Sequence, residues 1–168
     1  MLALGNAGSA GTEKGVLPVL RDGALAATLH ASNWKEAATA TVGDRSWIFS
    51  RQKRELTGRW AAEPEGLARL RARQASAWKG TWHLDLDGEP VEASVASRWR
   101  NTRRYLAGGR QIAESGSTGG WSPKPTLTTD PSLSLDHAVF LLWVELLIRK
   151  RAATQAASAA AGGAAAAG

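Results

Sequence analysis

Hydrophobic and polar residues alternate in short segments between residues 16 and 129. In one such segment Trp82, Leu84 and Leu86 share one face of an extended chain, and the residues between them share the other. A period of two residues is typical of a strand with one buried and one solvated face. The pattern therefore predicts many short strands in sequence, as in an all-β barrel or sandwich.

Turn signals separate these segments. They are two-residue pairs that contain glycine, the kind that tight hairpins require: Asp22-Gly23, Gly43-Asp44, Asp87-Gly88 and Gly108-Gly109. The strands that they connect are expected at residues 16–21, 24–31, 37–42, 45–50, 81–86, 91–97, 103–107 and 110–114. Antiparallel pairing of chain neighbours follows from such short connections.

The pattern changes once, after Asp130-Pro131. Ser134 is placed to cap a helix over residues 135–151, and residues 138–148 are apolar except for Glu145. At 1.5 Å per residue this apolar stretch is about 17 Å long, roughly half the hydrocarbon thickness of a bilayer. A helix that is apolar on every side needs protein on every side. The sequence thus predicts a closed barrel with this helix as its plug.

The two ends of the chain have a different composition. Residues 152–168 hold eleven alanines, three glycines and no charge. Small side chains bury too little surface to offset the entropy of ordering the chain, so we expect a disordered Ala/Gly tail there and a flexible segment over residues 1–14. The ordered domain is expected over residues 15–151.

Composition excludes several classes of protein. The chain has no cysteine, which excludes a disulfide scaffold, a thiolate metal site and a cysteine nucleophile. The three histidines have no metal-ligand spacing, and no glycine-rich turn precedes a helix that could hold a phosphate. We therefore expect no enzyme, no cofactor and no metal. The net charge of +6 favours anionic partners, although a GC-rich genome would give the same arginine excess.

The order of many short strands and then one hydrophobic helix resembles the tubby-like superfamily, which includes the LURP-one-related proteins and the phospholipid scramblases. The resemblance rests on residues 135–151, centred on Phe140-Leu141-Leu142-Trp143, and on the strand–turn–strand pattern of residues 101–114. Small bacterial members of unknown function are the most similar. The resemblance implies a barrel of about twelve strands around the helix. Tubby domains bind phosphoinositide headgroups through basic side chains, but none of those positions can be matched here.

Two groups of arginines are candidate binding residues. The first group surrounds or follows Trp99 and consists of Arg98, Arg100, Arg103 and Arg104. Cations interleaved with an aromatic ring suit phosphate contacts and stacking or insertion at a membrane surface. The second group is Arg69, Arg71 and Arg73, which alternate along one strand face. Each group has a plainer interpretation, since solvated strand faces and protected sheet edges also carry arginine, and Glu63 and Glu65 lie near enough in sequence to pair with the second.

Other residues stand out by their position in the pattern. A buried Glu145 would need a partner, and a barrel arginine is the expected one, with a functional carboxylate at one barrel mouth as the alternative. Most of the eight tryptophans are expected to fill the core, with Trp34, Trp60 and Trp121 near strand ends as candidates for exposure.

These observations predict a non-enzymatic, cytoplasmic binding module that is peripheral to a membrane. The expected ligand is an anionic lipid headgroup or membrane surface, bound by a basic outer face. A protein-interaction or regulatory domain is the main alternative, and nucleic-acid binding by the first arginine group is less favoured. No stretch reaches the length of a transmembrane span.

Overall fold

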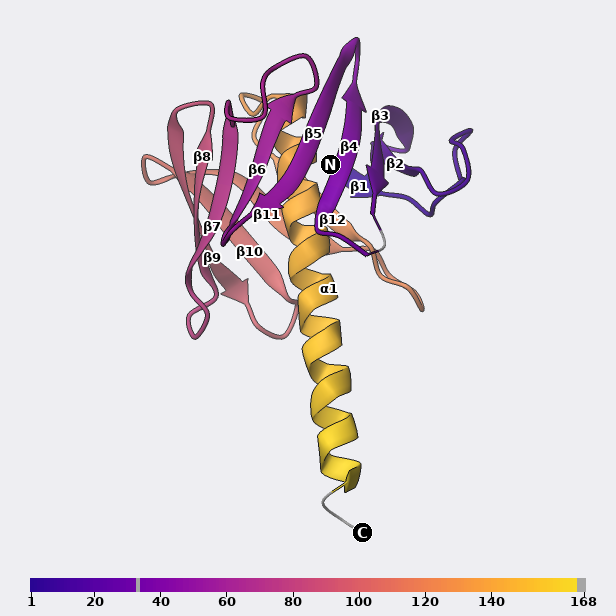
Figure 1. The fold of residues 1–168 in the computed structure, drawn as a ribbon, viewed down its shortest axis with the longest axis vertical. Coiled ribbons are helices and arrows are strands. Elements are labelled where there is room, and N and C mark those ends of the chain that lie inside the picture. Colours follow the sequence, from indigo (N-terminus) through magenta and orange to yellow (C-terminus); the bar gives the residue numbers. More distant parts are fainter. Residues whose placement is uncertain (33, 166–168) are drawn as a thin grey trace.

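The fold is known from a computed structural model, which describes residues 1–32 and 34–165, with side chains described to residue 161. Over these residues it contains twelve strands and one helix (Figure 1). The strands are β1 (Leu2–Leu4), β2 (Leu17–Arg21), β3 (Ala24–Ala31), β4 (Ala37–Val42), β5 (Arg45–Gln52), β6 (Glu55–Trp60), β7 (Leu70–Ser76), β8 (Thr81–Leu86), β9 (Glu89–Ser97), β10 (Thr102–Ala107), β11 (Arg110–Ser117) and β12 (Pro125–Thr129). The helix is α1 (Leu135–Ala165).

The strands form one closed antiparallel barrel in which each strand pairs with its neighbours in the chain. The seam lies between the first strand and the last, where Leu2 is opposite Leu127. The expected tight turns are present, because Asp87 and Gly88 both have positive φ angles of 59° and 92°. The fold class expected from the sequence is therefore confirmed.

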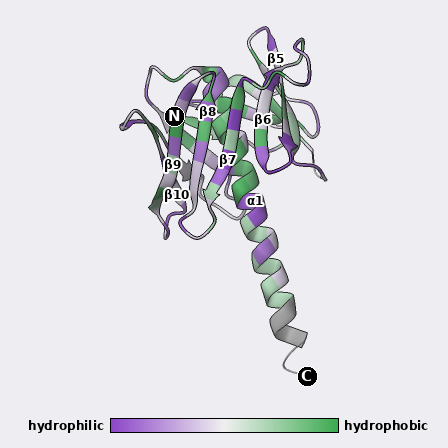
Figure 2. Cartoon of the chain, turned by 60° about the vertical axis from the view of Figure 1, so that its left-hand side comes forward, coloured by the Kyte–Doolittle hydropathy of each residue, from purple (hydrophilic) through white to green (hydrophobic). Residues whose placement is uncertain are grey.

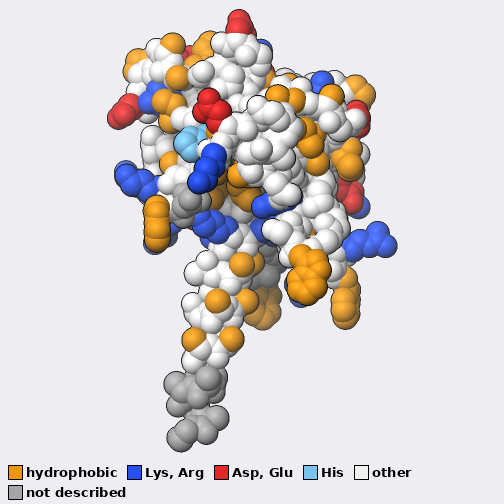
Figure 3. Space-filling model, turned by 90° about the vertical axis from the view of Figure 1, so that its right-hand side faces the viewer, with side chains coloured by type: hydrophobic (Ala, Val, Ile, Leu, Met, Phe, Trp, Pro, Cys, Tyr) orange, Lys and Arg blue, Asp and Glu red, His pale blue; other side chains and the backbone are white. Residues whose placement is uncertain are grey.

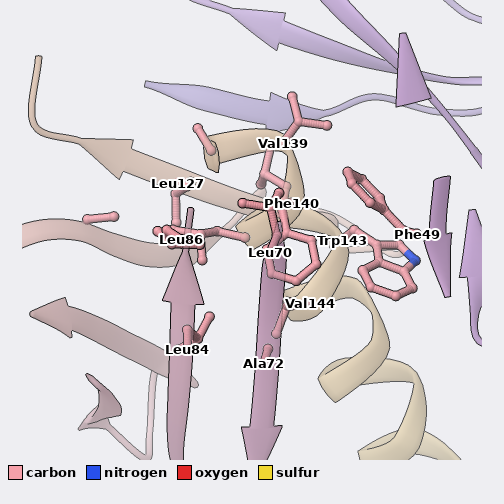
Figure 4. Packing of buried hydrophobic residues seen from close by; sticks show 14 of the residues in the cluster. Phe49, Leu70, Ala72, Leu84, Leu86, Leu127, Val139, Phe140, Trp143 and Val144 are labelled. Carbon is pink, nitrogen blue, oxygen red and sulfur yellow. The ribbon is translucent and has the colours of Figure 1, made fainter. Parts of the chain in front are cut away.

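The helix fills the barrel. Alternate strand residues point inward, and the helix meets them with a segment that is buried from Ala138 to Glu145. Phe49 lies against both Phe140 and Trp143, with ring centroids 5.4 and 5.2 Å apart (Figure 4). Each large aromatic side chain buries 150–250 Å² of surface, so these contacts dominate the core. Figure 2 shows a hydrophobic segment of α1 among barrel strands that carry both hydrophobic and hydrophilic residues.

Two expectations about the chain ends need correction. Residues 1–14 were expected to be flexible throughout, but Leu2 and Leu4 are buried in β1, which closes the barrel. The helix was expected to end at residue 151, but it continues to Ala165. Alanine has the highest helix propensity, and a helix already nucleated inside the barrel extends at little cost. Residues 166–168 of the expected tail lie outside the described residues.

Because the strands run alternately up and down, the loops fall into two sets at opposite ends. The end from which α1 leaves carries five loops that we call the exit rim: residues 32 and 34–36, 53–54, 77–80, 98–101 and 118–124. A sixth connection, residues 5–16, extends to the side in Figure 1. The opposite end, the far rim, consists of residues 22–23, 43–44, 61–69, 87–88, 108–109 and 130–134.

Candidate functional site

The exit rim gathers almost fully exposed tryptophans. Across the described part of the chain, four tryptophans have relative exposures above 90%, and each lies in a different exit-rim loop. They are Trp34 at 96%, Trp78 at 91%, Trp99 at 100% and Trp121 at 105%. Figure 3 shows large hydrophobic side chains at this end of the barrel, beside the emerging helix and among basic groups.

Three of these tryptophans share one local sequence, Ser-x-Trp-Lys/Arg, at residues 32–35, 76–79 and 97–100. In each copy the serine Oγ accepts a hydrogen bond from the backbone N–H three residues later, at 3.1, 3.1 and 3.3 Å. Serine closes turns in this way because its short side chain reaches the following backbone. The same turn thus places a tryptophan beside a cation at three positions on one rim.

Charge is strongly segregated between the two ends. By sequence, the exit-rim loops hold seven cations and one acid: Lys35, Lys53, Arg54, Lys79, Arg98, Arg100, Lys124 and Glu36. The helix adds Arg149, Lys150 and Arg151 where it leaves the barrel. The far-rim loops hold six acids and one cation: Asp22, Asp44, Glu63, Glu65, Asp87, Asp130 and Arg69. The modest net charge therefore hides a molecule with one strongly basic end.

The rim is tied to the helix. The Nε and Nη2 atoms of Arg151 donate to the two Glu36 carboxylate oxygens at 2.6 and 2.8 Å. These hydrogen bonds, assisted by Arg51, hold the pKa of Glu36 below its usual value of 4.5. On the other side of the barrel, Arg149 donates to the Gly116 carbonyl at 2.6 Å. The helix consequently leaves the barrel in a fixed direction.

A cavity of about 440 Å³ opens beside the helix exit. Its apolar wall includes Leu17, Leu146 and Leu147, and Lys124 and Lys150 also line it. The exit rim thus combines exposed aromatic rings, cations and an apolar depression in one place.

No family model, no curated protein and no solved structure matches this chain. The resemblance to the tubby-like superfamily stays a prediction.

The structure divides the first predicted arginine group. Arg98, Trp99 and Arg100 lie in the β9–β10 loop of the exit rim, all exposed. Arg104 is on the outer wall, 3.8 Å from Glu114. The prediction that Arg103 binds a ligand on the outer face is corrected, because its side chain points into the barrel and is buried. The register of β10 decides this, since successive strand residues point to opposite faces.

Arg103 takes part in a buried polar cluster with the helix. Its Nη1 donates to Glu145 Oε2 at 3.0 Å, and the Tyr105 hydroxyl donates to Oε1 at 2.7 Å. Burial, followed by the nearby carboxylate, raises the pKa of Tyr105 well above its usual value of 10.0. The expected salt bridge between Glu145 and a barrel arginine is thus confirmed.

The second predicted arginine group lies elsewhere on the molecule. Arg69 is in the far rim, where it bonds Glu63 at 2.6 Å and Asp87 at 3.3 Å. Arg71 pairs with Glu55 at 3.0 Å on the wall, and Arg73 is exposed there. The eight predicted binding residues therefore do not form one surface, and the pairing with Glu63 that the sequence suggested is present.

The tryptophan predictions were right in part. Trp34 and Trp121 are exposed as expected, but Trp60 is half-buried beneath the Arg69 guanidinium, 3.9 Å from the ring centroid. The exposure of Trp78 was missed. The signal that could have indicated it is the Ser-x-Trp-Lys/Arg repeat, which groups Trp78 with Trp34 and Trp99.

Two features are absent from the part of the chain that the structure describes. In this part of the chain no group of three or more His, Asp or Glu side chains is placed to hold a metal ion. Over the same residues, no helix combines the length and the hydropathy required to cross a membrane.

Proposed function

We propose that this chain is a non-enzymatic module that docks its exit rim on anionic membrane surfaces at the cytoplasmic face. The observation that carries the proposal is the placement of Trp34, Trp78, Trp99 and Trp121 at the basic end of the barrel. All four are exposed at the tips of separate loops, so they reach the same partner only if that partner covers the whole end.

Membrane interfaces suit this combination of side chains. Tryptophan is enriched there because its ring enters the headgroup layer while its N–H stays in contact with polar groups. A lysine or arginine near an anionic leaflet contributes about 1 kcal/mol, and the attraction fades within a Debye length of about 8 Å at physiological ionic strength. The aromatic and electrostatic contributions require the same end-on orientation, and the acidic far rim is then directed away from the lipid.

The test is co-sedimentation of the full chain with phosphatidylcholine vesicles, with and without phosphatidylserine. We expect binding to the anionic vesicles that weakens as salt rises. Replacement of all four rim tryptophans by serine is expected to weaken binding about tenfold or more, a loss of at least about 1.4 kcal/mol. Because these side chains are exposed, the variant should keep its circular dichroism spectrum and melting temperature.

A matched control removes exposed apolar side chains from the opposite end. Leu25 and Leu67 are 50% and 57% exposed near or in the far rim, and their replacement by serine should leave vesicle binding unchanged. An equal loss in this control, or no binding of the unchanged protein to anionic vesicles, refutes the proposal. In the latter case a protein partner becomes the better interpretation, and salt-sensitive binding to DNA or RNA alone would indicate a nucleic acid.

A further inference from the structure

The helix does not end at the exit rim. Beyond Arg151, α1 continues as a single helix to Ala165, well past the rim loops (Figure 1). Side chains 152–161 are all exposed, so within the described residues nothing covers this part of the helix. Any flat partner that reaches the rim tryptophans must also accommodate the projecting helix.

The composition of this extension is compatible with lipid. No charged side chain occurs between residues 152 and 168. The hydroxyl groups of Thr154 and Ser158 donate to the carbonyl oxygens four residues earlier, both at 3.0 Å. Within α1 the backbone carbonyls up to residue 161 accept from N–H groups four residues later, and such internal pairing is the condition for a segment to enter hydrocarbon. The side chain of Gln155, near the rim, is exposed.

The dimensions fit one leaflet. Residues 152–165 extend about 21 Å at 1.5 Å per residue, which matches the roughly 20–22 Å of one leaflet with its headgroup layer, of which about 15 Å is hydrocarbon. The cations of residues 149–151 stand at the base of the extension, where Arg151 bonds Glu36 of the exit rim. Long basic side chains are stable at this level of a membrane because their charged ends reach the headgroups.

The direction of the extension is also constrained. Its base is held by Arg149 on the Gly116 carbonyl and by Arg151 on Glu36. The preceding turns are enclosed by the barrel, so the helix cannot fold aside without breaking its own hydrogen bonds.

We infer that residues 152–165 enter the near leaflet as a spike when the exit rim docks, with the far part of the segment in the hydrocarbon. The inference rests on the proposed function and adds an insertion depth to it. The rim tryptophans and cations supply the affinity, because alanine gains little on transfer to lipid. The spike keeps the barrel upright on the surface.

The first test uses the sign of an added charge. Ala160 is exposed, about 14 Å beyond Arg151 along the helix. If the helix enters lipid, Ala160→Lys weakens binding to anionic vesicles more than tenfold, because a charge deep in hydrocarbon is costly. If the helix stays in water near an anionic surface, the same change strengthens binding. Ala62→Lys, at an exposed far-rim position, is the control and should change binding less than twofold.

The second test measures depth directly. The chain has no cysteine, so Ala160→Cys and Asp44→Cys each give a single labelling site in the full-length protein. On vesicles, an environment-sensitive fluorophore at residue 160 should shift to the blue and be quenched by nitroxides on the lipid chains. The label in the far-rim turn should do neither.

The outcomes separate the two proposals. Absence of vesicle binding refutes both. Binding with the residue 160 label still in water refutes the spike alone and leaves the rim proposal intact. A label that is already shielded in solution, together with a dimer in analytical ultracentrifugation, also refutes the spike, because a second copy of the chain then covers the helix.

Discussion

Glu145 is the residue on which the interior depends. It is the one charged side chain between residues 138 and 148, and its exposure is 0%. Arg103 and Tyr105 approach its two carboxylate oxygens from the same barrel strand. Since a carboxylate in such a place is costly without partners, the three side chains fix the rotation and depth of the helix in the barrel.

Removal of Arg103 alone should destabilise the fold more than removal of Arg103 and Glu145 together. We expect Arg103→Met to lower the free energy of unfolding by about 3–5 kcal/mol, because it leaves the carboxylate buried without a cationic partner. The double variant Arg103→Met with Glu145→Leu should recover part of that loss. Urea unfolding followed by circular dichroism measures both, and a single-variant cost below about 1 kcal/mol would contradict this account.

The role of a single residue could be predicted where one feature of the sequence determines it. An isolated Glu145 in an apolar helix requires a barrel partner, and the sequence indicated an arginine. It did not indicate Arg103, because the register of a strand against a helix depends on the whole barrel. The exposure of Trp99 was left open for a related reason, since a turn of four residues at 98–101 determines whether its ring faces the core or solvent.

At the scale of elements, the shortest strand closes the barrel. β1 has three residues, yet it pairs with β2 on one side and β12 on the other. Without it both neighbours would present unpaired backbone groups to solvent, which favours association between chains. Its brevity also explains why the sequence did not predict it, because three residues carry too little alternation to be recognised.

Deletion of residues 1–5 should therefore open the barrel. We expect a loss of about 3–6 kcal/mol from the two buried leucines, Leu2 and Leu4, and concentration-dependent oligomers in light scattering. Deletion of residues 152–168 is the control, since side chains 152–161 are exposed and stability should change by about 0.5 kcal/mol or less. Equal stability of the two truncated proteins would show that the seam contributes little.

The whole molecule has a basic end and an acidic end. This polarity was not visible in the net charge, and it appeared only when the strand order assigned each loop to a rim. The fold class could be predicted because alternation, turns and one apolar helix agree. The candidate site was predicted only in part. The sequence indicated Arg98, Trp99 and Arg100, but it did not show that residues from loops far apart in sequence meet on one rim, because the topology of the barrel brings them together.

The location of the charges, and not their number, should decide vesicle binding. We compare two variants that each lose three cations to alanine. The rim variant changes Lys79, Arg98 and Arg100, and the wall variant changes Arg71, Arg73 and Arg104. We expect the rim variant to bind phosphatidylserine vesicles at least about tenfold more weakly, and the wall variant to bind nearly as the unchanged protein does. Equal losses would restore the wall as a candidate surface.

The enclosed helix also sets an order for folding during synthesis. The strands are made first, and their apolar inner faces have no core to pack against until the segment from Ala138 to Leu147 has been made. Closure of the seam then joins Leu2 to Leu127, two residues near opposite ends of the barrel sequence. Such distant contacts slow folding and leave apolar strand surface exposed meanwhile. The nascent chain is thus most prone to aggregate just before its last helix is complete.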